Sequence, residues 1–233
     1  ALIWTIAPGI IEALGRAIYA MRDRAITAFV LFMAFSVAVY LPLHLDFGDG
    51  AWLEPGGYPL PIQTSRILLY LGYFLFGVVV GALDLRTGLF AETGELPRRW
   101  PIWLSFALLF YGAILLLVYA HHNWVADFNS PPQVWRVGYG LAFALFSAAM
   151  TFLEPAIFLR FARGSWRLMD ALRPSAYGIF LVHYIFIIWL QYWVYDHAWP
   201  AGVKAAVVFA GTLSLSWALV ALLRRIPWVA RII

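Results

Sequence analysis

The chain has 233 residues, of which 64% are hydrophobic and only 12% are charged. Soluble domains have about 45–50% apolar and about 25% charged residues, so this composition excludes a soluble globular fold and indicates a lipid environment. The sequence has no cysteine, which excludes disulfide bonds, thiolate metal sites and cysteine nucleophiles. Its net charge is +4, and the basic residues are distributed as membrane topology requires, as described below. We therefore expect no nucleic-acid partner.

Six segments are long and apolar enough to cross a bilayer, which takes about 20 helical residues. A seventh, shorter apolar stretch lies before Arg16. No basic region precedes it, so it is not a signal peptide, and we expect a helix that begins upstream of Ala1. We predict an all-α fold, a polytopic transmembrane bundle of about seven helices that forms a single transmembrane domain over residues 1–233. The six predicted spans are Ile26–Leu43, Ile67–Leu83, Ile102–Ala120, Val134–Leu159, Ser175–Val194 and Ala201–Leu223.

The basic residues alternate between the two ends of these segments. Of the sixteen Lys and Arg residues, only Arg66, Arg136 and Lys204 lie at one set of ends, and thirteen lie at the other. Loops rich in Lys and Arg stay in the cytoplasm. We therefore predict a cytoplasmic C-terminus and an Ala1 near the outer side. The thirteen are Arg16, Arg22, Arg24, Arg86, Arg98, Arg99, Arg160, Arg163, Arg167, Arg173, Arg224, Arg225 and Arg231.

His183 is the most informative polar residue in the predicted spans. It lies nine residues after Pro174, about 13 Å along a helix and near the middle of the hydrocarbon core. An ionisable side chain at that depth is costly unless it faces protein or water, so it is a functional candidate. Tyr177, Tyr184 and Gln191 recur every seven residues, which places them on one helix face. The alternative is a neutral His183 that bonds a neighbouring helix, with the tyrosines as packing residues.

Glu154 is the second candidate, in the inner part of the Val134–Leu159 segment. A carboxylate there can bind a cation, relay a proton or pair with an arginine of a substrate site. The alternative is an interfacial ion pair with Arg160 or Arg163. These two arginines are also candidates to bind the phosphates of a donor, because Arg pairs with phosphate in a bidentate manner.

Other patterns are less specific. Gly77 and Gly81 form a GxxxG face, which indicates helix packing. His122 and Asp127 have the spacing of the His–Asp pair in glycerolipid acyltransferases, but a hydrated loop explains them better. His121 and His122 have no third ligand nearby, so we predict no metal site. Walker A, GxGxxG, HExxH and GxSxG motifs are absent.

Three stretches together resemble the type 3 membrane acyltransferases. Pro174–Tyr184 resembles the Tyr-Gly-Ile-Tyr-Leu-x-His signature near the end of that family, with Phe180 in place of the second Tyr. Tyr73–Gly81 resembles its Phe-x-x-Gly-x-x-x-Gly helix, and Leu223–Pro227 resembles its usual ending. Their order and spacing cover the whole chain as the C-terminal part of a typical member.

The resemblance implies about ten helices with both termini inside, of which this chain would be the last seven. It implies an acyltransferase that moves an acyl group other than aminoacyl, commonly acetyl, from cytoplasmic acyl-CoA to a hydroxyl. The acceptor would be an envelope glycan, a lipid or a small molecule, and the reaction an O-acetylation. The location implied is a bacterial inner membrane, with acetyl-CoA as co-substrate and no metal.

The resemblance also assigns roles to residues. Members of the family carry a catalytic His with an upstream Arg in the first helix, and an Arg-x-x-Arg pair before the third. Neither feature is found at those places here, so we expect the chain alone to be inactive. The catalytic candidates are His183, Tyr177, Tyr184 and Glu154, and the substrate-binding candidates are Ser175, Gln191, Arg160 and Arg163.

Two other classes of protein stay open at this point. A membrane transporter or exporter would also be polytopic, but inverted repeats and paired broken helices are typical of transporters and neither is visible. A non-catalytic membrane subunit would pack its helices against a partner. An in-frame upstream extension with Arg and His would favour the acyltransferase, and a separate start codon would favour the subunit.

Overall fold

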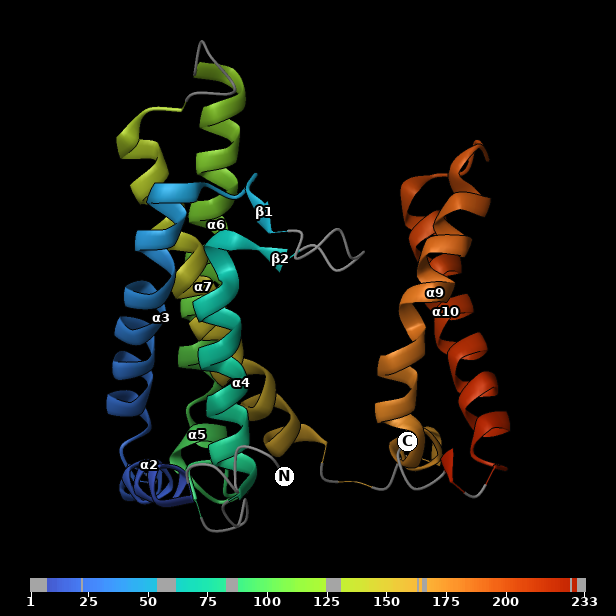
Figure 1. Ribbon diagram of the computed structural model, residues 1–233, viewed down its shortest axis with the longest axis horizontal. Coiled ribbons are helices and arrows are strands. Elements are labelled where there is room, and N and C mark those ends of the chain that lie inside the picture. Colours follow the sequence, from blue (N-terminus) through green and yellow to red (C-terminus); the bar gives the residue numbers. More distant parts are fainter. Residues whose placement is uncertain are drawn as a thin grey trace. The chain divides into compact units, whose positions relative to one another are not determined.

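The computed structural model describes residues 8–21, 23–53, 62–82, 88–124, 131–162, 164, 167–226 and 228–229. Within these residues the fold is almost wholly helical, and six helices are long and apolar enough to cross a membrane. The predicted all-α transmembrane fold is therefore confirmed. Contacts divide the chain into two compact units, Ala1–Arg163 and Gly164–Ile233, which are blue to olive and orange to red in Figure 1.

The larger unit contains four of the long helices, and the smaller unit contains two. In lipid every backbone N–H and C=O must be paired within the protein, so an uninterrupted apolar segment folds as a helix. Five of the six observed helices differ from the predicted spans by a few residues at their ends, and α10 matches its predicted span. The long helices are α3 (Ala25–Phe47), α4 (Ile67–Ala82), α6 (Trp100–Trp124), α7 (Gln133–Phe161), α9 (Ala176–Tyr195) and α10 (Ala201–Leu223).

Short elements connect these helices. Strands β1 and β2 pair antiparallel, with Trp52 opposite Gln63 and Leu53 opposite Ile62. They join α3 to α4 at the end of the unit away from α2 and α5 (Figure 1). The short elements are α2 (Pro8–Ala20), β1 (Trp52–Leu53), β2 (Ile62–Gln63), η2 (Thr64–Arg66), α5 (Glu95–Arg98), α8 (Arg167–Leu172) and η3 (Arg173–Ser175).

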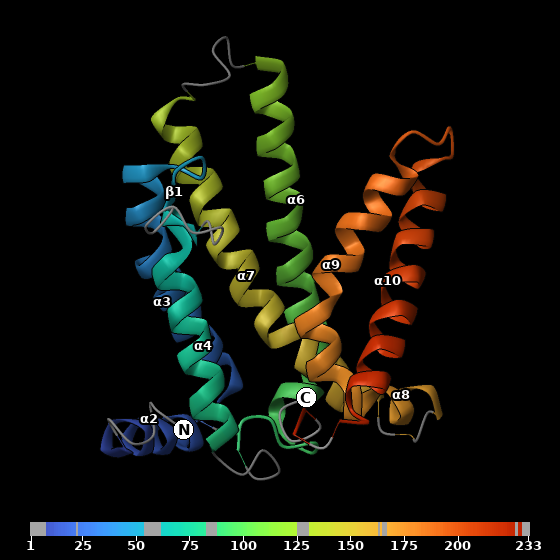
Figure 2. The same ribbon diagram turned by 45° about the vertical axis from the view of Figure 1, so that its right-hand side comes forward.

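The opening helix, α2, includes the described part of the predicted seventh segment. It has 13 residues, about 20 Å of helix. Ile18 and Met21 pack against the core of the larger unit, while Arg16 and Tyr19 are exposed. Figure 2 shows α2 lying across the ends of α3 and α4. For the described residues of this stretch, the amphipathic pattern favours a helix at the membrane surface and not a span.

Aromatic side chains fill the core of the larger unit. The ring of Phe29 on α3 lies 4.9 Å from that of Trp103 on α6 and 5.2 Å from that of Phe152 on α7, between centroids. Trp103 is fully buried, and its indole N–H donates to the carbonyl of Leu96 at 2.9 Å. A buried indole needs such a partner, so this bond ties α6 to the segment that precedes it.

The glycines of α4 pack differently from the prediction. A Cβ at Gly77 or Gly81 would have nothing within 4 Å, and both glycines are exposed. The close approach occurs at Gly72, where a Cβ would lie 2.4 Å from the ring of Phe35 on α3. Among the described residues, the face of α4 that contains Gly72 therefore meets α3, and the GxxxG face does not.

A glutamate from α5 caps the start of α3. Glu95 Oε2 accepts a hydrogen bond from the backbone N–H of Ala25 at 3.1 Å, and Oε1 accepts one from Arg99 at 2.9 Å. The first N–H groups of a helix have no partner within the helix, and a carboxylate there also complements the helix dipole. Glu95 thus fixes the arginine-rich end of α3 to the short helix before α6.

In the smaller unit, α9 and α10 form an antiparallel pair. Gly211 lets them approach closely, because a Cβ there would lie 2.8 Å from Leu190 Cδ1. At the turn between them, Lys204 Nζ donates to the carbonyl of Tyr195 at 2.8 Å. The pair is therefore held both at its middle and at its turn.

We predict that Glu95→Ala lowers the free energy of unfolding by about 1 kcal/mol, the usual cost of losing a helix cap. Glu95→Gln keeps an acceptor oxygen and should lose less. Equilibrium unfolding in detergent measures both. Glu154→Ala is the matched control, since Glu154 is an exposed glutamate of the same unit, and its stability should be unchanged. A Glu95→Ala variant as stable as this control would show that the cap contributes nothing.

Candidate functional site

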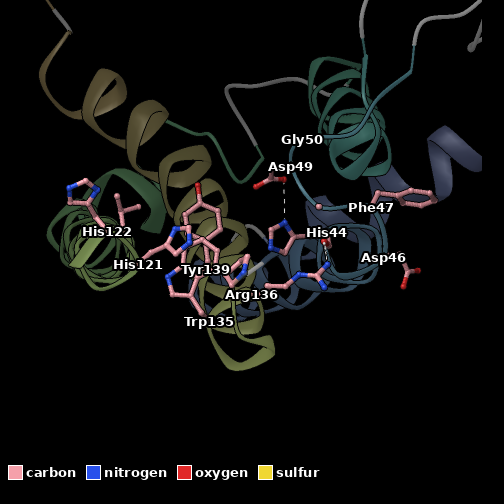
Figure 3. A pocket seen from close by; sticks show the side chains of 13 residues that line it. His44, Asp46, Phe47, Asp49, Gly50, His121, His122, Trp135, Arg136 and Tyr139 are labelled. Carbon is pink, nitrogen blue, oxygen red and sulfur yellow. Dashed lines mark hydrogen bonds and ion pairs between the residues drawn. The ribbon is translucent and has the colours of Figure 1, made fainter. Parts of the chain in front are cut away.

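A cavity of about 760 Å³ opens at the end of the larger unit where α3 ends and α7 begins. Side chains from α3, the segment after it, the end of α6 and the first turns of α7 surround it (Figure 3). Segments up to about 90 residues apart in sequence therefore meet at one place. The polar side chains of its lining include His44, Asp46, Asp49, His122, Arg136 and Tyr139.

A row of buried polar side chains on α3 leads to this cavity. Ser36, Tyr40 and His44 follow one another every four residues, which places them on the same helix face. They are 0%, 0% and 4% exposed. The helix continues past Pro42 to Phe47, so His44 belongs to the helix and not to the following loop.

The end of α3 is closed by two features. Gly48 adopts φ 67°, a left-handed conformation that glycine reaches without strain, and it turns the chain back over the helix end. Arg136 on α7 donates through Nη2 to the carbonyl oxygens of His44, at 3.3 Å, and Leu45. The carbonyl of His44 also accepts a hydrogen bond from the backbone N–H of Gly48 at 2.9 Å, and a cation at a helix C-terminus is favourable.

Asp49 is the common acceptor of the cluster. Its Oδ1 lies 3.2 Å from His44 Nδ1. Tyr40 Oη donates to Oδ1 and Oδ2 at 3.0 and 3.2 Å, and Ser65 Oγ donates to Oδ1 at 2.8 Å. Gln63 donates through Nε2 to the backbone carbonyl of Asp49. The carboxylate thus joins α3 to η2, and the backbone carbonyl of Asp49 adds a contact with β2.

The Asp49 carboxylate determines that Nδ1 of His44 carries a hydrogen. Burial opposes ionisation of Asp49, but hydrogen bonds from His44 and Ser65, with one from Tyr40, outweigh it and lower the pKa of the carboxyl to about 2. A carboxylate only accepts hydrogen bonds, so Nδ1 of His44 carries a hydrogen. In the neutral imidazole, Nε2 then keeps its lone pair.

His44 Nε2 is buried and has no hydrogen-bond partner among the described residues. It faces α7 at Gly140, where a Cβ would lie 2.8 Å from His44 Cδ2 and 3.5 Å from Nε2. Only glycine leaves room for the imidazole at this position. A histidine oriented by a carboxylate through Nδ1, with Nε2 unprotonated, is the arrangement of a general base.

Aromatic rings stiffen the α7 side of the cavity. Trp135 stacks on Tyr139 with centroids 5.1 Å apart and planes at 13°, and His121 lies 4.4 Å from Trp135. One turn further, the guanidinium of Arg66 lies 4.5 Å from the ring centroid of Phe143, a cation–π contact. The wall is therefore held in place by contacts that involve η2, α6 and α7.

The predicted residues of α9 separate into two groups. His183 lies near the middle of α9, as predicted, and lines a second cavity of about 680 Å³ together with Gln191. Its Nδ1 lies 2.5 Å from the carbonyl oxygen of Phe180 in its own helix. Tyr177 and Tyr184 are 56% and 66% exposed and do not line that cavity. The structure therefore brings together His183 and Gln191 but leaves the two tyrosines outside.

The other predicted residues are spread over both units. Glu154 and Arg160 on α7 are both exposed. Six residues of helix separate them by about 120° around the axis, and no ion pair joins them in the described part of the chain. Arg163 lies outside the described residues. Ser175 is buried at the start of α9. The roles assigned to these residues and to His183 stay predictions.

The sequence reasoning missed His44, Tyr40 and Asp49. The predicted span ended at Leu43, which assigned His44 to a loop. The available signal was the four-residue spacing of Ser36, Tyr40 and His44 inside an otherwise apolar segment. The structure does not test the His122–Asp127 pair, because Asp127 lies outside the described residues.

Comparison with known proteins adds independent information. A family model described as an acyltransferase domain, that of the type 3 acyltransferases, matches residues 15–221. The match includes both units and every long helix. Searches of curated proteins and of solved structures found no significant match.

Asp49→Asn should remove a contribution to stability that depends on pH in a defined window. The folded-state pKa of about 2 lies below the ordinary value of 3.8, so ionised Asp49 stabilises the folded state above about pH 4. The contribution is about 2 kcal/mol and is lost as the pH falls through 2. The native protein should exceed Asp49→Asn by a constant amount from pH 8 to pH 5, and the difference should narrow below pH 4.

Unfolding by denaturant in detergent at each pH measures this difference. The exposed Asp170→Asn is the control and should show no such narrowing. A difference for Asp49→Asn that keeps the same size down to pH 3 and below would contradict a lowered pKa.

Gly140→Ala should destabilise the larger unit by about 1–3 kcal/mol, the usual cost of overpacking, because the new methyl group would meet His44 and Leu41 at 2.8 Å. Gly112→Ala on α6 is the matched control, since its Cβ would meet nothing within 4 Å. Thermal unfolding of both variants tests the close approach of α3 and α7. Equal stability of the two variants would show that α3 and α7 can move apart with no loss of folding free energy.

Proposed function

Because the chain belongs to the type 3 acyltransferase family, we propose that it is part of a membrane enzyme in which His44 is the general base for acyl transfer to a hydroxyl. Family membership and the six apolar helices establish a multi-pass membrane acyltransferase. We further propose that the donor is an acyl-CoA, that the acyl group is acetyl, and that the reaction is O-acetylation of the acceptor. The observation that carries the proposal is the His44–Asp49 pair beside the cavity.

The chemistry follows from the protonation of the pair. Asp49 holds the imidazole through Nδ1–H, and Nε2 takes the proton of the acceptor hydroxyl. The acceptor oxygen then forms a bond with the thioester carbonyl carbon, and the carbon–sulfur bond breaks. The proton on Nε2 passes to the leaving thiolate, which departs as free CoA. The imidazole thus returns to its starting state.

Two requirements follow from the geometry. Nε2 is buried against Gly140, so the imidazole must shift slightly toward the cavity, with its bond to Asp49 kept, when the acceptor binds. Catalytic hydrogen bonds are often poorly aligned in a free enzyme and tighten in the substrate complex. Arg136 bonds the carbonyls of His44 and Leu45, so it keeps the backbone of α3 in place while the ring shifts.

The position of the cavity supports an acceptor from outside the cytoplasm. His44 lies near the end of α3 that is opposite the arginine-rich end, about 29 Å from Ala25 along the helix. We propose that the arginine-rich ends and the C-terminus face the cytoplasm, in a bacterial inner membrane. A cytoplasmic acyl-CoA must then extend its acyl end through the bundle, while an envelope glycan or lipid reaches the cavity directly.

The test measures the transfer of labelled acetyl from acetyl-CoA to hydroxyl acceptors. It uses membranes of cells that express the protein from its natural open reading frame. His44→Gln should lower the rate by about 100-fold or more, the usual contribution of a general base. The exposed His122→Gln changes a histidine of the same cavity that has no carboxylate partner among the described residues, and it should stay within twofold of the native rate. Size-exclusion chromatography checks that each variant is folded.

His183→Gln distinguishes the two histidine hypotheses. If His44→Gln keeps its activity while folded His183→Gln loses it, the base is the residue predicted from the sequence motif. If the native protein transfers no label to any acceptor extract, the proposed donor or reaction is wrong.

A further inference from the structure

The smaller unit contains a second cavity, a groove of about 680 Å³ between α9 and α10. Among the described residues it is lined by these two helices, and most of its wall is apolar, with Ile187, Val208 and Leu213 among the side chains. An apolar groove with a few placed polar groups is the usual form of a small-molecule site. The side chains of the lining with polar groups are Lys204, Gln191, His183, Thr212 and Tyr195.

Thr212 is unusual among these groups. Its side chain is 7% exposed, and Oγ1 is buried with no hydrogen-bond partner among the described residues. A threonine within a helix commonly bonds the carbonyl four residues earlier, as Thr151 does to Ser147 at 2.9 Å. A buried hydroxyl left unpaired is costly. A ligand that pairs with it in the groove would remove that cost.

His183 lies deeper in the groove than Thr212. It is twelve residues from Tyr195, about 18 Å along α9. A carbonyl oxygen can only accept, so the contact between Nδ1 and the carbonyl of Phe180 requires a hydrogen on Nδ1. Thr212 is therefore the polar group that meets a ligand hydroxyl in the middle of the groove.

Lys204 marks the outer end of the groove and is the only lysine of the chain. Its ammonium gives one hydrogen to the carbonyl of Tyr195 and has two more to offer. Tyr192, Trp193 and Tyr195 are exposed nearby, and exposed aromatic residues of this kind mark the membrane–water interface. Lys204 therefore lies at the level of anionic head groups. Eight residues of α10 place Thr212 about 12 Å deeper.

We propose that this groove binds a single-chain amphiphile with an anionic head group at Lys204 and a hydroxyl about 12 Å along its chain, at Thr212. A long-chain hydroxy fatty acid has this chemistry. An unsubstituted acyl chain would leave the hydroxyl of Thr212 unpaired, so the site prefers the hydroxylated chain. The site belongs to the smaller unit and does not depend on the proposed role of His44.

The test is displacement of a fluorescent long-chain fatty acid from the protein in nanodiscs of zwitterionic lipid. The competitors are 10-hydroxystearate and stearate, which differ only in the hydroxyl. The native protein should prefer 10-hydroxystearate by about tenfold, the effect of pairing a buried hydroxyl. Thr212→Val should bind both acids equally, while Lys204→Gln should weaken both alike. Val208→Trp fills the groove and should abolish displaceable binding.

Two variants serve as matched controls. Ser214→Ala removes an exposed hydroxyl two residues from Thr212, and Arg225→Gln removes an exposed charge at the other end of α10. Both should bind as the native protein does. Equal affinity of the native protein for the two acids, or an unchanged preference in folded Thr212→Val, would overturn the proposal. Unchanged binding in Val208→Trp would show that the acids bind elsewhere.

Discussion

Asp49 is the residue on which the polar end of the larger unit depends. A carboxylate in a partly buried position needs donors, and it finds them in Tyr40, His44 and Ser65. These donors come from α3 and from the segment that leads into α4, so one carboxylate fixes the course of the chain between two membrane helices. The same interaction decides which nitrogen of His44 carries hydrogen. The hydrogen bonds of Asp49 therefore determine both the fold of this end of the unit and the tautomer of His44.

The apolar part of the larger unit makes this constraint effective. Glycine contacts bring α3 close to α4 at Gly72 and close to α7 at Gly140, and packed aromatic rings fill the space between the helices. Small residues allow such approach in membranes, where association depends on packing and not on the exclusion of water. Because Gly140 faces the imidazole directly, backbone packing and the position of the candidate base are coupled. The tertiary cap from Glu95 holds the other end of α3.

Sequence patterns predict the spans well and the candidate site poorly. Spans depend on local hydrophobicity, so the predicted Ala201–Leu223 matches α10. The contacts of Asp49 depend instead on the turn at Gly48 and on the approach of η2, which no local pattern contains. His183 was found by depth and motif alone, and its contact with Phe180 could not be foreseen.

The central claim is that Asp49 fixes the tautomer of His44 and leaves Nε2 as the basic nitrogen. Nitrogen-15 NMR of the histidine-labelled protein tests it most directly, with the His44 signals assigned by comparison with His44→Gln. At neutral pH the spectrum should show a protonated Nδ1 in a hydrogen bond and an unprotonated Nε2 for His44, and both features should change in Asp49→Asn. A His44 that carries its hydrogen on Nε2, or whose signals are the same in Asp49→Asn, would contradict the claim.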